Sequence, residues 1–298
     1  MAEGGALNLD GHVIRKVCVV VNEASGRAGA NAPRIAREIL AQVGLDARIH
    51  TPPPDELVAA LKRALSEQPD LLILVAGDGT ARTAAELCGR TGPLLAPLPG
   101  GTMNMLPHAL YGARDWPTAL REVLRGGVVR SVGGGSVEGQ NFYVAAVLGG
   151  PALWADAREA ARAGHIAEAV RRGQRALRRT VAGRLRFSIN DGPVERAEAL
   201  TLITPLISSV LRDEAPVLEA ATLDPHSAVD VFRLAAKALA GSWRCDPAVV
   251  SRLCRKGRAM ALGRIPAILD GEPVRLGRTA EIRFQPSAFR ALALPRDA

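Results

Sequence analysis

The stretch LLILVAGDGTARTAAELC, Leu71 to Cys88, joins an apolar run to a segment of helix-forming residues through the turn Gly-Asp-Gly-Thr. This order predicts a buried strand, a tight turn and a helix. Gly77 and Gly79 can adopt positive φ and let backbone N–H groups come close to a phosphate, and we expect Thr80 to cap the helix. The turn therefore suits an anion, although an ordinary Asp-Gly turn is the alternative.

The carboxylate of Asp78 lies between the two glycines. Beside a bound phosphate it would be repulsive by itself. It is expected there only if it holds Mg²⁺, directly or through water, or handles the proton of an acceptor hydroxyl. Asp78 therefore points to phosphoryl chemistry.

Strand-like and helical segments alternate on both sides of this stretch. The apolar runs KVCVVVN, ARIHT, LLILVAG and PLLAPLPG each precede an amphipathic or helix-forming segment. The alternation predicts an α/β domain, a parallel sheet with helices on both faces, over residues 13–127. Residues 128–298 are expected to form a mainly β, sandwich-like domain with hairpins near Asp191-Gly192 and Asp270-Gly271, and a return of the last segment to the first domain is left open.

Two other predicted strands of the first domain end in similar turns. VVVNEASGRAG leaves its strand through Asn22 toward Ser25-Gly26, and APLPGGTMN leaves through Gly100-Gly101, with Thr102 as a second expected helix cap. In a parallel sheet these turns open on one edge, so they predict a nucleotide cradle. Neither GxxxxGK[ST] nor GxGxxG occurs there, which disfavours a P-loop or a dinucleotide site.

Composition restricts the partners. The chain has 298 residues, enough for two domains, and a net charge of +8, which favours anionic partners. Aromatic residues make up only 3%, which argues against nucleic acid. Residues 152–180 have helix-forming composition and many arginines, and we expect either a solvated surface helix or contact with an anionic membrane or a nucleotide; the arginines are Arg158, Arg162, Arg171, Arg172, Arg175, Arg178 and Arg179.

Two expectations, the cellular location and the state of the cysteines, rest on features that the sequence lacks. No apolar run reaches the roughly 20 residues that span a bilayer, and the start lacks the order of a secretion signal, so we expect a cytoplasmic protein. The cysteines, at positions 18, 88, 245 and 254, have no CxxC spacing, and the histidines have no metal-ligand spacing. These patterns predict reduced packing thiols and no zinc site.

Four motifs carry a resemblance. NEASGRAG (22–29) is similar to an Asn-Pro-x-Ser-Gly loop, AGDGT (76–80) to a Gly-Gly-Asp-Gly-Thr signature, PLPGGTMNMLPHALYG (97–112) to a Pro-x-Gly-Thr-x-Asn segment, and ILDGEP (268–273) to an Asp-Gly-Glu motif. In this order and spacing, over nearly the whole chain, they resemble the diacylglycerol kinase catalytic-domain family, which includes bacterial lipid kinases and sphingosine and ceramide kinases.

The resemblance implies an ATP-dependent lipid kinase, a phosphotransferase acting on an alcohol such as diacylglycerol. Glu272 matches the proton acceptor, assisted by Asp270 or Asp78. A Mg²⁺ loop of bacterial members resembles AATLDPHSAVDV and points to Asp224, where Asp-Pro replaces the family's Asp-Gly. The positions that match nucleotide-binding residues are Asn22, Ser25, Gly26, Thr51, Gly77, Asp78, Gly79, Thr80 and Thr102.

The implied partners are ATP with Mg²⁺, a lipid alcohol and, at the inner membrane surface, anionic lipid; a homodimer is left open. Two alternatives are kept. An NAD kinase shares a Gly-Gly-Asp-Gly turn, but the Gly-Thr-x-Asn segment and the long β part favour the lipid kinase. A catalytically silent nucleotide or lipid sensor is permitted by departures from the family pattern, such as Met105 in place of the Asp after Asn104 and Arg82 where many members have Asn, whereas Asp78 and Glu272 argue against it.

Overall fold

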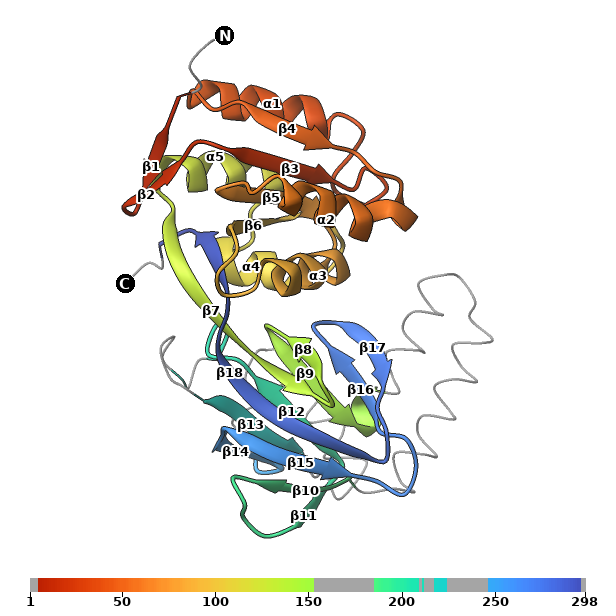
Figure 1. The fold of residues 1–298 in the computed structure, drawn as a ribbon. Coiled ribbons are helices and arrows are strands. Elements are labelled where there is room, and N and C mark those ends of the chain that lie inside the picture. The colour runs from red at the N-terminus through yellow and green to blue at the C-terminus, as the bar shows by residue number, and fades with distance from the viewer. Residues whose placement is uncertain (1–4, 153–184, 209–210, 212–216, 224–245, 296–298) are drawn as a thin grey trace. The chain divides into compact units, whose positions relative to one another are not determined.

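The structure is a computed structural model that describes residues 5–152, 185–208, 211, 217–223 and 246–295. The chain divides into two compact units, Met1–Gly133 with Ser287–Ala298, and Gly134–Pro286. Strands β7 and β18 each continue from one unit into the other (Figure 1).

The first unit is an α/β fold built on the parallel strands β4, β3, β5 and β6, in the order β6-β5-β3-β4. The last part of β18 adds a parallel neighbour to β6 at Ala291. The strands are β1 Leu7–Leu9, β2 His12–Ile14, β3 Val17–Val21, β4 Ala47–His50, β5 Leu71–Ala76, β6 Leu94–Pro99 and, shared with the second unit, β7 Val128–Val137 and β18 Thr279–Ala293. The helices are α1 Ala32–Gln42, the 3₁₀ turn η1 Pro54–Glu56, α2 Leu57–Ser66, α3 Asp78–Cys88, α4 Met105–Tyr111 and α5 Trp116–Gly126.

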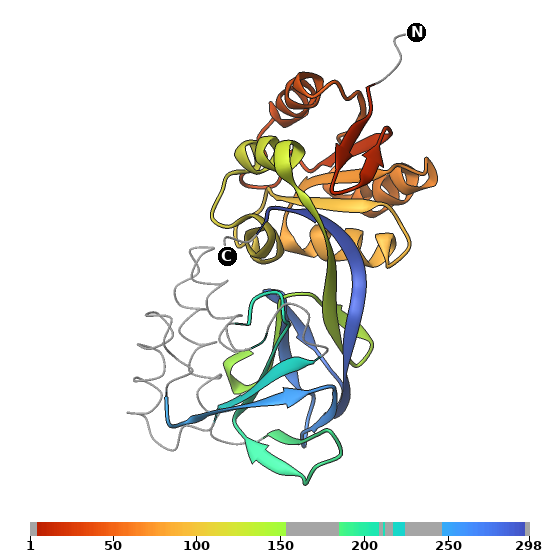
Figure 2. The ribbon, with the colours of Figure 1, turned by 90° about the vertical axis from the view of Figure 1, so that its left-hand side faces the viewer.

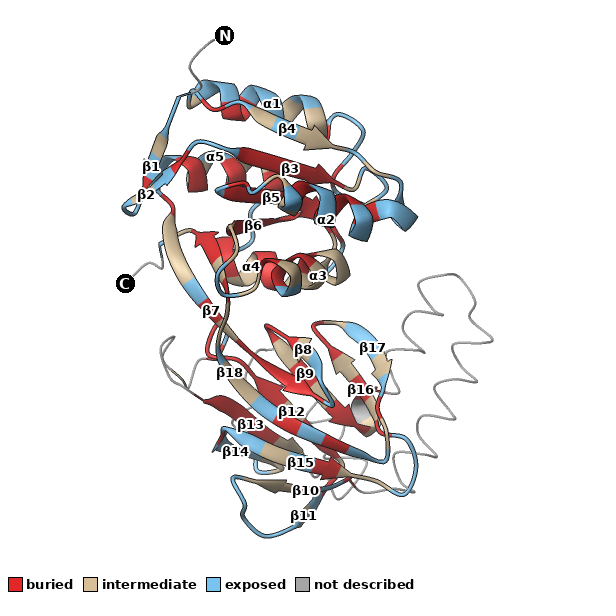
Figure 3. Ribbon diagram, in the orientation of Figure 1, coloured by how far each residue is buried: buried red, intermediate tan, exposed pale blue. Residues whose placement is uncertain are grey.

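Helices cover both faces of this sheet. Helices α1 and α5 pack against each other, and α2, α3 and α4 form a second group (Figures 1 and 2). Every residue of β3, β5 and β6 is buried, as Figure 3 shows, which is why these strands read as continuous apolar runs and not as an alternation. The predicted parallel sheet with helices on both faces is confirmed.

Local sequence sets the ends of individual helices. Asp115 precedes α5, and its carboxylate accepts a hydrogen bond from Thr118 N at 2.9 Å. Hydrogen bonds from Thr118 lower the pKa of Asp115. Pro117 occupies the first turn, where a missing N–H costs nothing. The amphipathic pattern of α5 then buries Trp116 and Leu120 against the sheet.

The second unit consists mainly of antiparallel strands, which confirms the predicted β character. One sheet has the order β14-β13-β12-β9-β16-β17, and the other includes β11, β10, β15, β18, β7 and β8. Buried side chains from both sheets, such as Phe142, Leu200, Phe187 and Ile282, form one core. The remaining elements are β8 Gln140–Phe142, β9 Ala145–Gly149, the 3₁₀ turn η2 Gly150–Ala152, β10 Leu185–Ile189, β11 Glu195–Ala197, β12 Ala199–Ile203, β13 Leu218–Leu223, β14 Val249–Cys254, β15 Lys256–Met260, β16 Pro266–Leu269 and β17 Glu272–Arg275.

Both predicted hairpins form. Strands β10 and β11 pair around a turn in which Asn190 and Asp191 have positive φ, and β16 and β17 pair around Asp270-Gly271. Among the described helices, none combines the length and the apolar character that a bilayer span requires.

Candidate functional site

The turns after β3, β5 and β6 meet at one edge of the parallel sheet. The three strands are neighbours in register and end at Val21, Ala76 and Pro99. Strand β4 lies next to β3 and ends at His50, so the exposed Thr51 follows at the same edge. Ligands of open α/β sheets bind at this carboxyl edge, and the sheet brings the predicted nucleotide-binding residues of the first unit to it.

Backbone hydrogen bonds tie the first turn to the other two. Asn22 N donates to Val75 O at 2.9 Å, and Arg27 N donates to Gly100 O at 2.9 Å. The Asn22 side chain organises its own turn, because its Oδ1 accepts from Ala24 N at 3.1 Å. The Asn22–Gly29 loop is therefore held in place from both sides.

Glycines allow the second and third turns to touch. A Cβ added to Gly101 would lie 2.6 Å from Gly77 Cα, whereas a Cβ on Gly77 would lie 3.8 Å from Gly101 Cα and 3.9 Å from Ser25 Oγ. A Cβ on Gly26 would have Thr102 Oγ1 as its nearest atom, at 4.0 Å. The hydroxyl groups of Ser25 and Thr102 therefore lie beside bare backbone, with room next to Gly77 and Gly26.

Three expectations about this edge are wrong. Gly77 is extended (φ −84°, ψ 173°), and Gly79 lies within α3, so neither glycine uses positive φ. Helix α3 already begins at Asp78, which puts Thr80 inside its first turn and not at its N-cap; Gly77 is the N-cap, with no side-chain cap bond. Thr102 is not a cap either, because Asn104 precedes α4. Close backbone approach explains the glycine at Gly101, where a Cβ would lie 2.6 Å from Gly77 Cα, whereas a Cβ on Gly77 would make only ordinary contacts.

The uncapped start of α3 matters for binding. The first backbone N–H groups of a helix have no partner within the helix, and they point outward along its positive end. No side chain caps them at Gly77. The start of α3 thus offers donors to an anion at the sheet edge.

Asn104 is a residue of this edge that the sequence reasoning did not single out. It is fully buried and has φ +51°. Its Oδ1 accepts from Gly101 N at 2.7 Å, and its Nδ2 donates to Gly101 O at 2.9 Å. Asn104 thereby fixes the Gly-Gly-Thr turn, and the Gly-Thr-x-Asn spacing was the signal that could have revealed it.

Asp78 connects α3 to α4. Its Oδ1 accepts from Leu106 N at 3.4 Å. Burial raises the pKa of Asp78, and hydrogen bonds from the backbone of Leu106, Met105 and Asn104 oppose that shift. A partly desolvated carboxylate beside the turns is a group that a cation or a proton stabilises.

The second unit contains the Asp-Gly-Glu motif, where the two acids have different surroundings. Leu269 pairs with Glu272 across a turn whose central residues both have positive φ, Asp270 at +48° and Gly271 at +88°. Glu272 is exposed, whereas Asp270 is 3% exposed. The Asp270 carboxylate accepts from the backbone N–H groups of residues 143, 144 and 145 at 2.7, 2.8 and 3.0 Å. Asp270 therefore fixes the hairpin that carries Glu272.

We expect Asp270→Asn to lower the free energy of unfolding by about 2 kcal/mol, because the amide cannot accept all three charge-assisted bonds. Asparagine tolerates the left-handed backbone, so the backbone itself is not strained. Urea unfolding followed by circular dichroism measures the change. Asp191→Asn is the matched control, at φ +62° but with a 76% exposed side chain paired to Lys256, and it should cost well under 1 kcal/mol. Equal costs for both variants would contradict the anchoring role.

Asp224, the residue proposed for Mg²⁺ in the β part, and the arginine-rich segment 152–180 beyond Ala152 lie outside the described residues.

The comparisons with known proteins agree with these motifs. Residues 16–136 match the model of the diacylglycerol kinase catalytic domain. A search of curated proteins gives no match. The fold is similar to that of a diacylglycerol kinase from Bacillus anthracis, with a TM-score of 0.67 and 16% identity over 95% of this chain and 98% of the other. A second Bacillus anthracis structure, described as a candidate diacylglycerol kinase, gives a TM-score of 0.71 and 18% identity over 95% of this chain and 98% of the other.

The matched residues 16–136 include the sheet edge with its Asn22, Asp78 and Asn104 turns. The solved structures share the fold over both units. Residues 16–136 therefore resemble a diacylglycerol kinase catalytic domain in sequence, and the chain resembles the two solved structures in fold.

Proposed function

We propose that the protein is an ATP-dependent lipid kinase that transfers the γ-phosphoryl group of ATP to a lipid hydroxyl such as that of diacylglycerol. The observation that carries the proposal is the meeting of three turns at one sheet edge, where a Cβ on Gly101 would lie 2.6 Å from Gly77 Cα and the backbone at Gly77 and Gly26 is left bare. Such a surface of bare backbone and small hydroxyl groups is suited to phosphates.

The residues at this edge fit a nucleotide. Ser25 and Thr102 supply hydroxyl groups, and the start of α3 supplies N–H groups at Asp78, Gly79 and Thr80. The space beside Gly26 and Gly77 admits an oxygen where a side chain would intrude. We assign ATP binding to this set, with Asn22 holding the first turn and Thr51 at the end of β4 completing it.

Asp78 is the described residue that fits Mg²⁺, directly or through water, since burial already raises its pKa and a cation would stabilise its charged form. When bound, the ion would neutralise charge on the β- and γ-phosphates. Asp224 is the second candidate ligand.

For the transfer itself we assign the proton of the lipid hydroxyl to Glu272. The hydroxyl oxygen bonds to the γ-phosphorus, the bond from that phosphorus to the β,γ-bridging oxygen breaks, and ADP leaves. The carboxylate of Glu272 accepts the proton as the bond forms. Asp270 holds the hairpin and acts through Glu272, so we assign it a positioning role.

The test is an assay with γ-labelled ATP and Mg²⁺ against a panel of lipid extracts and pure lipid alcohols, with NAD as a separate arm. Label recovered in a phospholipid supports the proposal, and the lipid that carries it identifies the acceptor. Label recovered in NADP would show an NAD kinase instead. ATP binding without label in any acceptor would favour the silent sensor.

We also propose peripheral contact with anionic membrane through the arginine-rich segment. Each Lys or Arg near an anionic surface contributes about 1 kcal/mol, and salt screens the attraction. Replacing Arg171, Arg172 and Arg175 together by alanine should therefore weaken co-sedimentation with phosphatidylglycerol-containing vesicles at low salt roughly 10²-fold. The triple lysine variant keeps the charge and should bind like the wild type. Equal sedimentation of all three proteins would leave only a solvated surface segment.

A further inference from the structure

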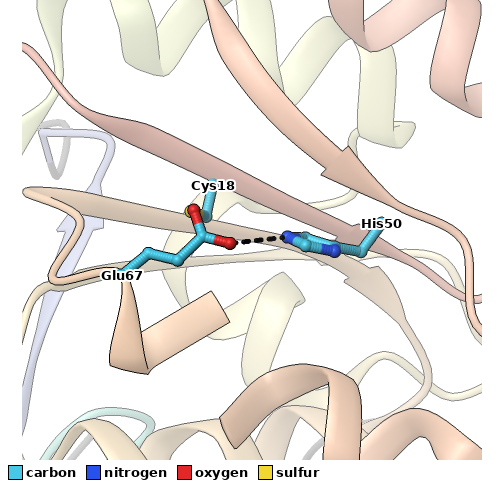
Figure 4. A group of neighbouring side chains, drawn as sticks. All are labelled: Cys18, His50 and Glu67. Carbon is cyan, nitrogen blue, oxygen red and sulfur yellow. Dashed lines mark hydrogen bonds and ion pairs between the residues drawn. The ribbon is translucent and has the colours of Figure 1, made fainter. Parts of the chain in front are cut away.

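Three potential metal ligands lie together in the first unit, although they are far apart in the chain. Cys18 lies in β3, His50 at the end of β4, and Glu67 directly follows α2 (Figure 4). In the parallel register Cys18 is opposite Arg48 and Val20 is opposite His50. Residues two apart in a strand share a face, so Cys18 and His50 lie on one face of the sheet. Helix α2 packs on β3 and brings Glu67 to the pair.

The distances between the donor atoms suit a tetrahedral metal ion. Cys18 Sγ lies 3.6 Å from Glu67 Oε2, and His50 Nε2 lies 3.6 Å from Glu67 Oε1. The three donor atoms all lie within 4.8 Å of one another. Zinc bonds of ~2.3 Å to sulfur and ~2.0 Å to nitrogen and oxygen imply ligand separations of about 3.3–3.6 Å in a tetrahedron. Small side-chain adjustments would therefore complete three ligand positions.

The burial of the group also points to a ligand. Cys18 is fully buried, while the side chains of His50 and Glu67 are 22% and 18% exposed. His50 Nε2 is buried and has no hydrogen-bond partner among the described residues, because Glu67 Oε1 at 3.6 Å is too distant. Buried ring nitrogens normally have a partner, and a metal ion between Nε2 and the carboxylate would supply it.

We propose that Cys18 Sγ, His50 Nε2 and the Glu67 carboxylate bind one borderline-soft divalent metal ion, of which Zn²⁺ is the best match, with water in the fourth position. Sulfur and imidazole ligands select such ions over Mg²⁺. On binding, the thiol proton is released to solvent and the Sγ–metal bond forms, with no change of oxidation state.

The neighbouring cationic side chains do not prevent metal binding at this group. Arg48 Nη1 lies 3.1 Å from Glu67 Oε2, but its side chain is 69% exposed, and ion pairs with an exposed partner are weak. Arg48 can therefore turn into solvent when a metal takes its place. Lys16 Nζ donates to the backbone oxygen of Glu67 and not to its carboxylate.

A bound ion would join β3, β4 and the end of α2, and it would hold His50, the residue immediately before Thr51. We therefore assign the site a structural role in the first unit. The role does not depend on the kinase reaction, and it can be tested without ATP.

The experiment uses the full chain, stripped with a chelator and titrated with Co²⁺ in the absence of nucleotide. The wild type is expected to bind one equivalent with the thiolate-to-cobalt charge-transfer absorption and the strong visible bands of a tetrahedral site. Zn²⁺ should abolish both signals, whereas excess Mg²⁺ should not. Thermal unfolding should shift to higher temperature with Zn²⁺.

Variants identify the ligands. Cys18→Ser should abolish the charge-transfer band, and His50→Gln and Glu67→Gln, at partly exposed side chains that the fold tolerates, should each weaken Co²⁺ binding at least about tenfold. Cys88→Ser, at a buried thiol of α3 outside the group, is the matched control and should bind like the wild type. The proposal is overturned if the wild type shows no charge-transfer band, or if the band survives in Cys18→Ser.

Discussion

Replacing Glu272 with glutamine is expected to lower kcat roughly 10²-fold or more, the usual scale of general base catalysis, while leaving the affinity for ATP nearly unchanged. Glutamine keeps the size and the hydrogen-bonding capacity of the side chain and removes its basicity. The residue is exposed at the start of β17, so its replacement leaves no cavity and no unpaired buried charge. Steady-state kinetics on the identified lipid, together with calorimetric titration of ATP, measure both quantities.

Glu281→Gln is the matched control for this variant. Glu281 is also a strand carboxylate of the second unit, its side chain is 53% exposed, and it pairs with Arg258 and Arg283. Its loss should leave kcat within about twofold of the wild type, because exposed ion pairs contribute little. Wild-type turnover by Glu272→Gln would show that the base is another residue, and Asp78 would become the candidate.

Replacing Gly77 with alanine is expected to weaken ATP binding about 10²-fold with little change in stability. The added Cβ meets Gly101 Cα at 3.8 Å and Ser25 Oγ at 3.9 Å, which are ordinary contacts, and the extended backbone suits alanine. A phosphate in the same space would meet the methyl group, and overpacking of that kind costs about 1–3 kcal/mol. In the ATP-free protein two effects on the free energy of unfolding oppose each other. Alanine is a poorer N-cap than glycine, which lowers stability, and it reduces the entropy of the unfolded chain, which raises stability. The two offset each other within about 1 kcal/mol.

Two other glycines make this test specific. A Cβ on Gly126, in the last turn of α5, would have no heavy atom within 4 Å, so Gly126→Ala should leave ATP affinity and stability unchanged or slightly raise stability. A Cβ on Gly101 would lie 2.6 Å from Gly77 Cα, so Gly101→Ala should destabilise the first unit itself. Normal ATP affinity in a folded Gly77→Ala protein would exclude this edge as the phosphate site.

Most of the fold could be predicted from the sequence because local patterns coincide with the elements. LLILVA became β5 and its five-residue counterpart VCVVV became β3, since strands buried on both faces read as continuous apolar runs. The amphipathic segment after Asn31 became α1, and the Asp-Gly dipeptide at Asp270 became a hairpin turn. The first three motifs likewise located the sheet edge, because they follow β3, β5 and β6 directly.

Details within the turns could not be predicted, because they depend on contacts between segments. The sequence suggested that Thr80 and Thr102 cap helices, but α3 begins three residues earlier than a cap at Thr80 implies, and Asn104 takes the position before α4. The sequence also suggested a conformational reason for Gly77. Only the packing of the turn after β5 on the turn after β6 shows that a side chain on Gly101 would collide with the backbone of Gly77.

The sequence by itself determined the α/β and β parts, their strands and helices, and the motifs that carry the family resemblance, because periodicity and turn chemistry are local properties of a chain. Tertiary structure decided which side chains meet. Cys18, His50 and Glu67 have no metal-ligand spacing, yet parallel register and the return of α2 place their donor atoms within 4.8 Å of one another. In the same way Asp270 reads as a turn residue, and its role as an anchor exists only because residues 143–145 pass beside its carboxylate. Contacts of this kind depend on the path of the backbone through space, which spacing along the sequence does not encode.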